Sequence, residues 1–79
     1  MTTGEYRVGL SFNPGGNERV SLIKRAAADL IDLIDLHIPN MEEAGAAYSG
    51  EVLRLKALAM THIEDAAMWA VKAATKPPR

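Results

Sequence analysis

The sequence predicts an all-α protein in which an N-terminal arm or short helix precedes an antiparallel two-helix hairpin. Apolar residues recur at alternating spacings of three and four in two long segments, 17–38 and 51–75, and this spacing is typical of amphipathic helices. A short connection, 39–50, separates the segments, and two helices joined in this way run antiparallel. With 79 residues, the whole chain, 1–79, is expected to form a single helical domain.

Residues 1–16 are predicted to form an N-terminal arm that ends in a loop. Four apolar residues alternate with others in this arm, which fits a short strand or an extended segment, and a short helical turn is equally compatible: Tyr6, Val8, Leu10 and Phe12. The following Asn-Pro-Gly-Gly-Asn sequence, 13–17, ends any regular structure.

The first long helix is predicted over 17–38. Asn17 is a suitable N-cap, because its side chain can accept from the free N–H groups of the first turn, and Glu18 suits the helix dipole. Pro39 should stop the helix near His37 or Ile38. The predicted apolar stripe consists of Val20, Ile23, Ala27, Leu30, Ile34 and His37.

The second long helix is predicted over 51–75. In the connection before it, Asn40 followed by Glu43 is a capping signal, so the connection is either a short turn of helix or a flexible segment. The tail 76–79, Lys-Pro-Pro-Arg, ends the helix. The predicted apolar stripe consists of Val52, Leu55, Ala59, His62, Ala66, Trp69 and Ala73.

Both predicted helices are apolar on more than one side, which is more surface than one hairpin can cover. A domain of this size is marginally stable alone, and without cysteine it cannot use disulfides. We therefore expect the hairpin to pack against copies of itself as a homo-oligomer.

The composition excludes several classes of protein. The net charge of −1 argues against binding to DNA or RNA polymers, because proteins that bind nucleic acids usually carry an excess of basic residues. No apolar run approaches the roughly 18 residues of a membrane span, so no membrane partner is expected. No signal peptide is visible, and an intracellular protein is the resulting expectation.

The residues that could carry catalysis do not form a convincing set. Asp29, Asp32 and Asp35 lie three apart, and a solvated acidic face explains them better than a metal site. His37 and His62 fall on different helices and are interpreted as packing or capping residues. No serine has a base partner, and no nucleotide-binding fingerprint is present. No catalytic residue, metal or cofactor is expected.

The loop from Phe12 to Asn17 is the strongest candidate for ligand binding. It joins an aromatic ring, an amide side chain and two glycines to a helix N-terminus, and Lys24 and Arg25 follow within two turns. Aromatic faces stack on bases, and backbone N–H groups beside a cation bind phosphate. The alternative, which spacing alone favours, is a helix-entry loop that Phe12 packs against the hairpin.

Two further features of the second helix have alternative interpretations. Arg54 is either a solvated, ion-paired residue or a phosphate ligand at an oligomer axis, where symmetry would multiply it. Met68 and Trp69 are interpreted as interface residues in preference to a platform for a ligand.

Residues in both halves of the chain resemble a known family. On the second helix, one pattern consists of Arg54, Ala59, Thr61, Ile63, Glu64, Ala66, Met68 and Trp69. This pattern resembles the helical hairpin shared by the phage anti-CBASS cyclic-nucleotide sponges and the anti-Thoeris sponges. The N-terminal half resembles the anti-CBASS group through Phe12-Asn13-Pro14-Gly15-Gly16-Asn17, Ile23-Lys24 and Ala28-Asp29-Leu30-Ile31-Asp32. The resemblance extends from about Tyr6 to Thr75.

The resemblance implies a homohexamer that binds cyclic dinucleotides such as cyclic GMP–AMP, and in some members cyclic trinucleotides, without cleaving them. By this comparison, Phe12 and Asn13 would contact the bases and Lys24 the phosphates of a cyclic dinucleotide. Phe12 stands where the family pattern has tyrosine, so Tyr6 is an alternative stacking residue. Arg54 is the implied residue of the trinucleotide pocket.

These expectations describe a sponge that sequesters the second messengers of bacterial anti-phage defence in the cytoplasm of the infected host. The main alternative is a structural or adaptor hairpin that binds proteins through a Met68-Trp69 face. A small phosphodiesterase is a third reading, and it would require the Asp29, Asp32 and Asp35 stripe to bind metal.

Overall fold

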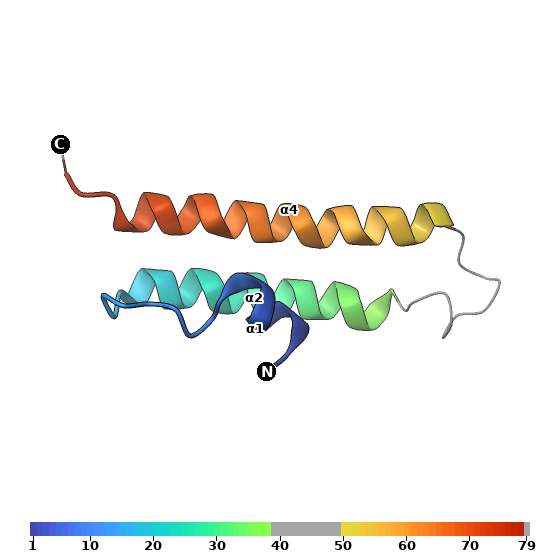
Figure 1. The fold of residues 1–79 in the computed structure, drawn as a ribbon, viewed down its shortest axis with the longest axis horizontal. Coiled ribbons are helices and arrows are strands. Elements are labelled where there is room, and N and C mark those ends of the chain that lie inside the picture. The colour runs from blue at the N-terminus through green and yellow to red at the C-terminus, as the bar shows by residue number, and fades with distance from the viewer. Residues whose placement is uncertain (39–49, 79) are drawn as a thin grey trace.

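The computed structural model describes residues 1–38 and 50–78 of the chain. In this part of the chain all regular structure is helical, in three elements: α1 (Thr3–Val8), α2 (Glu18–His37) and α4 (Gly50–Thr75). α2 and α4 run antiparallel side by side, as Figure 1 shows, which confirms the all-α hairpin. The predicted capping signal of Asn40 and Glu43 lies outside the described residues.

α1 forms because its ends are well capped. The Thr2 hydroxyl accepts from the Glu5 N–H at 3.1 Å, and the Glu5 carboxylate accepts from the Thr2 N–H at 2.8 Å, which is a reciprocal capping box. Gly9 ends the helix with φ at 64°, a left-handed conformation that glycine adopts without strain. Of the conformations considered for the arm, residues 3–8 therefore adopt the helical one.

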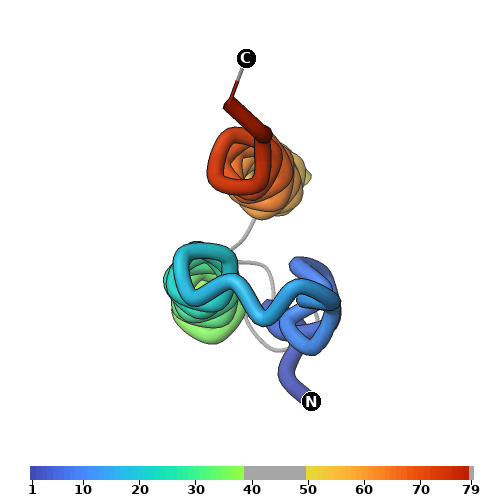
Figure 2. The backbone as a smooth tube through the Cα atoms, turned by 90° about the vertical axis from the view of Figure 1, so that its left-hand side faces the viewer, coloured from blue at the N-terminus to red at the C-terminus, as the bar shows by residue number. Residues whose placement is uncertain are grey.

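α1 docks closely on α2 at a glycine. A Cβ atom added to Gly4 would lie 2.1 Å from the carbonyl oxygen of Ala28, so only glycine fits there. The Gly4 N–H donates to the Asp32 carboxylate at 2.7 Å, and the Arg25 guanidinium pairs with Glu5 at 2.8 Å. In the end-on view of Figure 2, α1 accordingly lies beside α2, while α4 packs along an adjacent side of α2, so that α1 also reaches α4.

The three aspartates of α2 have three different partners. Asp29 pairs with Arg25, Asp32 accepts from α1, and Asp35 pairs with the ammonium of Lys56 at 3.2 Å. The three aspartates are therefore not simply a solvated acidic face, because Asp32 and Asp35 connect α2 to other helices. They do not converge on one site either, as a metal cluster would require. Within the described residues no group of acidic and histidine side chains has the arrangement of a metal site.

The caps of α2 explain its length. The Asn17 side chain accepts from the N–H groups of Arg19 and Val20 at 2.9 and 3.2 Å, and Glu18 lies in the first turn. At the other end, the N–H of Ile38 donates to the carbonyl of Ile34, and the backbone then leaves the helical conformation.

Within the described ranges, no helix is long and apolar enough to cross a membrane.

The core of the hairpin is small; Val20 and Ala27 of the predicted α2 stripe belong to it, whereas on α4 the core is displaced from the predicted stripe. Trp69, Leu55 and His62 of the α4 stripe are exposed, whereas Lys56 and Met60 are buried. Successive residues of a helix are turned by about 100°, so the buried face lies roughly one residue away from the predicted one. The buried apolar side chains are Val20, Ala27, Ala28, Ile31, Met60 and Ala67.

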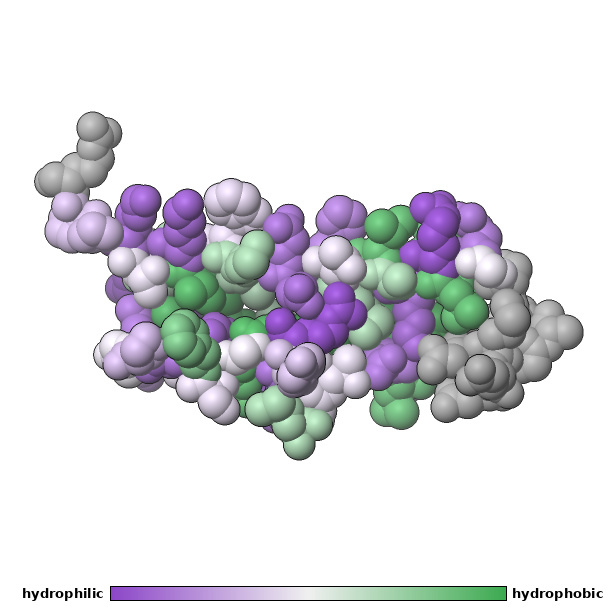
Figure 3. Space-filling view, in the orientation of Figure 1, coloured by the Kyte–Doolittle hydropathy of each residue, from purple (hydrophilic) through white to green (hydrophobic). Residues whose placement is uncertain are grey.

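The reason for this displacement is that lysine fills two core positions. The Lys24 and Lys56 side chains are buried along their apolar stems, and oxygen atoms bind their ammonium groups. A pattern based on apolar residues cannot detect such positions. Much of the predicted α4 stripe instead marks exposed surface, and Figure 3 shows apolar residues exposed over both long helices on the face that carries α1.

The dependence of stability on pH tests how α1 is held. The Thr2 N–H, followed by the Arg25 guanidinium, lowers the pKa of Glu5 from 4.5 to about 2. Because the folded-state pKa is lower than the unfolded one, the carboxylate stabilises the fold above a pH of about 4.5 and loses this effect as the pH falls to about 2. The difference in free energy of unfolding between wild type and Glu5→Gln should therefore shrink over this range in urea titrations. A difference that stays constant would contradict the role given to Glu5.

Candidate functional site

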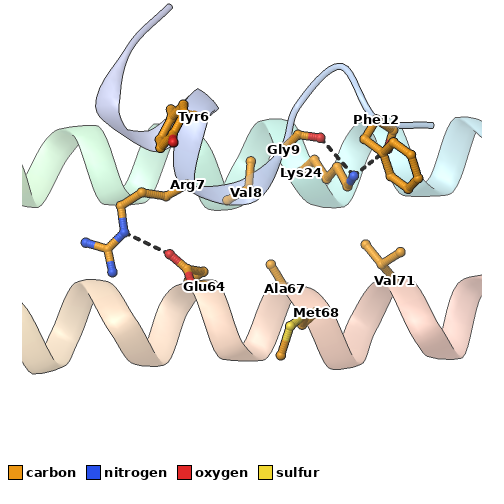
Figure 4. Close-up of a pocket in the computed structure, with 10 residues that line it drawn as sticks. All are labelled: Tyr6, Arg7, Val8, Gly9, Phe12, Lys24, Glu64, Ala67, Met68 and Val71. Carbon is orange, nitrogen blue, oxygen red and sulfur yellow. Dashed lines mark hydrogen bonds and ion pairs between the residues drawn. The ribbon is translucent and has the colours of Figure 1, made fainter.

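A cavity of about 490 Å³ lies between the N-terminal segment and α4. Figure 4 shows its two walls, with Tyr6, Val8 and Phe12 on one side and residues of α4 on the other. Its lining combines two aromatic rings, two cations, one carboxylate and an apolar floor on α4: Tyr6, Phe12, Arg7, Lys24, Glu64, Ala67, Met68 and Val71. This volume is within the range of small-molecule sites.

A second hollow of about 500 Å³ adjoins the first one. Phe12, Lys24 and Val71 line both, and the second hollow continues along the loop from Asn13 to Asn17 and the end of α4. The ring of Phe12 therefore borders two concave surfaces. Together they form a groove between the N-terminal loop and the C-terminal half of α4.

Lys24 determines the conformation of the loop that carries Phe12. Its ammonium donates to the carbonyl oxygens of Gly9 at 2.9 Å and Phe12 at 2.5 Å, and lies 5.5 Å from the centroid of the Phe12 ring. Since the residue is only 7 % exposed, these bonds are shielded from water. The sequence predicted a lysine that faces ligand, and the structure places it in the core with two of its three N–H donors engaged.

The two aromatic side chains are exposed, which is unusual for rings of this size. Tyr6 is 77 % exposed and Phe12 is 73 % exposed, although both line the cavity. Neither ring packs the monomer's core, so each ring remains accessible to a flat ligand, although the Lys24 ammonium lies over the Phe12 ring. Tyr6 and Phe12, the two candidates for base stacking, thus line the same cavity. Either ring, or both, can therefore face a ligand bound there.

Asn13 is engaged within its own loop. Its amide nitrogen donates to the Asn17 carbonyl at 2.8 Å and to the Ser21 hydroxyl at 3.0 Å, and its oxygen accepts from the Asn17 N–H at 3.1 Å. These bonds fix the loop before α2. Asn13 lines the second hollow and not the first.

Arg7 and Glu64 enter the site although sequence reasoning did not select them. The Arg7 Nε donates to Glu64 at 2.8 Å, and its Nη2 donates to the Thr61 hydroxyl at 3.3 Å. This pair joins α1 to α4 across 57 positions of sequence, and no local pattern marks such a contact. The Thr2-Glu5 capping box would have revealed α1, but not the partner of Arg7.

Arg54 lies apart from the cavity, in the first turns of α4. Its guanidinium donates two hydrogen bonds of 3.2 and 2.5 Å to the Glu51 carboxylate, and these bonds raise the pKa of the guanidinium. Ten residues separate it from Glu64, which corresponds to about 15 Å along a helix. Arg54 and the loop residues therefore belong to separate surfaces.

Met68 and Trp69 do not share one face of α4. Met68 lines the cavity beside α1, while Trp69 is turned by about 100° from it and lies outside the lining. The Trp69 ring is covered in part by the ammonium of Lys72, 5.4 Å from its centroid. Both side chains are exposed, so a protein-binding surface that contains the two residues stays a prediction.

The geometry defines a small helical hairpin with a ligand-sized cavity whose walls offer stacking surfaces and cations. Residues 5–75 match the family model of the Acb2/Tad1 hairpin domain, and the chain belongs to this family, which comprises the anti-CBASS and anti-Thoeris sponges. The members of this family are phage proteins that bind cyclic-nucleotide signals; the family is known for binding and not for enzymatic activity. No curated protein and no solved structure is a significant match to the chain. The resemblance seen in the sequence is confirmed.

Replacing Lys24 tests its role in holding the loop. Lys24→Met keeps the apolar stem and removes the donors, so the carbonyls of Gly9 and Phe12 lose bonds worth about 1.5–3 kcal/mol each. Because two such bonds are lost, the free energy of unfolding should fall by roughly 3–6 kcal/mol in denaturant titrations. Lys72→Met, which changes an exposed lysine, should alter it by less than about 0.5 kcal/mol. Equal effects of the two changes would show that Lys24 does not hold the loop.

Proposed function

We propose that the protein sequesters cyclic dinucleotides, the second messengers of bacterial anti-phage defence, and releases them chemically unchanged. The observation that supports this proposal is that Tyr6, Phe12 and Lys24 line the same cavity in a member of a sponge family. A cyclic dinucleotide presents two flat bases and two phosphates. Exposed rings and a buried cation are the groups that such a ligand requires.

The aromatic rings of Phe12 and Tyr6 stack on the bases in this proposal. Base–aromatic stacking contributes about 1–3 kcal/mol per base. Because both rings are exposed before the ligand arrives, stacking removes apolar surface from water without displacing core residues. Asn13 supports the loop and borders the second hollow, where a base that extends past Phe12 would meet it.

Lys24 contributes its charge and its remaining N–H donor to a phosphate. The ammonium is bound by carbonyl oxygens and a ring, which do not cancel its charge. In a shielded position, that charge attracts an anion more strongly than an exposed lysine does. The same residue therefore holds the loop and makes the cavity electropositive.

Arg54 is proposed as the residue of a separate site for cyclic trinucleotides. It is exposed at the start of α4, away from the cavity, and its fork binds a carboxylate in the absence of ligand. A phosphate can replace that carboxylate with the same two-point geometry. One arginine per chain becomes a strong anion site only when symmetry brings copies together.

Self-association into a homohexamer is the proposed state of the protein. The exposed apolar side chains occur along both long helices and include Leu22, Leu30, Leu33, Leu36, Leu55, Leu58 and Trp69. Apolar exposure of this extent marks a surface that another protein covers. Copies of the same chain are the simplest partner, since closed symmetric assemblies are the common form of soluble oligomers.

The proposed place of action is the cytoplasm of the infected bacterial host, where the messengers are made. Sequestration lowers the free messenger concentration and so prevents activation of the effector. This mode of action requires tight binding and no bond cleavage. It therefore needs none of the nucleophiles, bases or metals that a phosphodiesterase would require.

Calorimetry with cyclic GMP–AMP and the Phe12→Ala variant tests this function. Wild type should bind the ligand, and the loss of one stacking ring should weaken binding at least tenfold. Chromatography of the denatured complex should return the intact cyclic dinucleotide. Recovery of linear dinucleotide would place the protein among the enzymes, and absence of binding by wild type would end the proposal.

Arg54→Ala is the matched control for this experiment. It removes an exposed side chain remote from the cavity, so cyclic dinucleotide binding should equal that of wild type, while any cyclic trinucleotide binding should weaken. Sedimentation should give the same six-chain assembly for wild type and Phe12→Ala, because Phe12 does not pack the core. A folded monomer would contradict the proposed assembly.

A further inference from the structure

Glu64 is an unexpected residue in a cavity proposed to receive phosphates. It is the acidic side chain among the described lining residues, and it lies in the α4 wall opposite the segment that carries Tyr6. A carboxylate repels a phosphate, so its position there is unfavourable unless it binds another part of the ligand. The two cations and one anion of the lining still leave the cavity with a net charge of +1.

The Glu64 carboxylate is held in a fixed position. Its Oε1 accepts from the Arg7 Nε at 2.8 Å, and Arg7 is itself held by the Thr61 hydroxyl at 3.3 Å. The side chain of Arg7 is 25 % exposed and that of Glu64 is 41 % exposed, so the pair borders the cavity and stays accessible to a ligand. Each carboxylate oxygen has two acceptor positions, so the bond from Arg7 leaves acceptor capacity toward the cavity.

The chemistry of the bases determines which one this acceptor suits. Guanine presents two adjacent donors, N1–H and the N2 amino group, which match the two oxygens of a carboxylate. Adenine presents its N6 amino group beside the unprotonated N1, whose lone pair would face the second carboxylate oxygen. A site built to accept from two donors rejects a base that lacks one of them.

We propose that Glu64 is the specificity-determining residue of the cavity and that it selects guanine, so that guanine-containing cyclic dinucleotides bind in preference to those with adenine alone. Arg7 is a positioning residue in this scheme, because it orients the carboxylate and offsets its charge. The inference rests on the proposed function, since it concerns the base that the same cavity receives.

Titration of the full-length protein with cyclic di-GMP and cyclic di-AMP tests the inference. Wild type should bind cyclic di-GMP at least tenfold more tightly. Glu64→Gln should weaken cyclic di-GMP binding at least tenfold, because the amide turns an N–H donor toward a guanine donor. It should leave cyclic di-AMP binding unchanged or improve it, since one acceptor beside one donor complements adenine. The preference of wild type should thus be lost or reversed.

Two control variants separate base selection from a structural effect of the ion pair. Arg7→Met breaks the pair but keeps the carboxylate, so it should keep a preference for guanine that is smaller than that of wild type, because the carboxylate is no longer oriented. Asp65→Asn removes the neighbouring exposed carboxylate and should change neither affinity.

The outcomes distinguish this inference from the proposed function. Equal binding of both ligands by wild type, or an equal loss of both in Glu64→Gln, would overturn the role of Glu64 while the sponge function stands. A loss of guanine preference in Arg7→Met equal to that in Glu64→Gln would show that the ion pair acts only on the structure. Failure of wild type to bind either ligand would instead remove the proposed function.

Discussion

The buried ammonium of Lys24 holds the carbonyls of Gly9 and Phe12, and the rest of the site depends on this contact. The loop from Gly9 to Asn17 contains turns and no helix or strand. A charged donor shielded from water gives it a defined conformation, because leaving that donor or its two carbonyl acceptors unpaired would be costly. The ring of Phe12 is thereby fixed at the rim, exposed before any ligand binds.

The position of α1 follows from a second set of contacts that begin at Gly4. The close approach to Ala28, the bond to Asp32 and the Glu5–Arg25 pair attach α1 to α2, and the Arg7–Glu64 pair attaches it to α4. The cavity lies between the N-terminal segment, which these contacts hold in place, and α4. Its walls therefore come from parts of the chain that are far apart in sequence, and its polar groups are held by other residues before ligand enters.

The sequence predicted the helices better than it predicted their contacts. Spacing of apolar residues, the Asn17 cap and Pro39 indicate two long helices because they are local signals, and the structure contains both. The same spacing placed Trp69 and Leu55 on one apolar stripe, and both are exposed because the buried face of α4 lies about one residue away from that stripe. Apolar residues encircle much of each helix, so their period does not determine which side faces inward, and the buried Lys56 lies on the side that hydrophobicity excludes.

The candidate site was predicted in part for a related reason. Phe12 and Lys24 were selected from a local sequence, and both line the cavity. The function of Lys24 in the loop could not be predicted, since a hydrogen bond to a carbonyl depends on a loop conformation that no motif specifies. Glu64 and Arg7 were missed because their contact spans most of the chain. The family resemblance supplied the ligand class, which the spacing of these residues alone does not determine.

A crystal structure of the protein with cyclic GMP–AMP is the most direct test of the central claim, that the loop held by Lys24 forms the binding site. The ligand should occupy the cavity between the N-terminal segment and α4, with a base stacked on Phe12 or Tyr6. Lys24 should still donate to the carbonyls of Gly9 and Phe12. A ligand bound on another surface, with this cavity empty, would contradict the account.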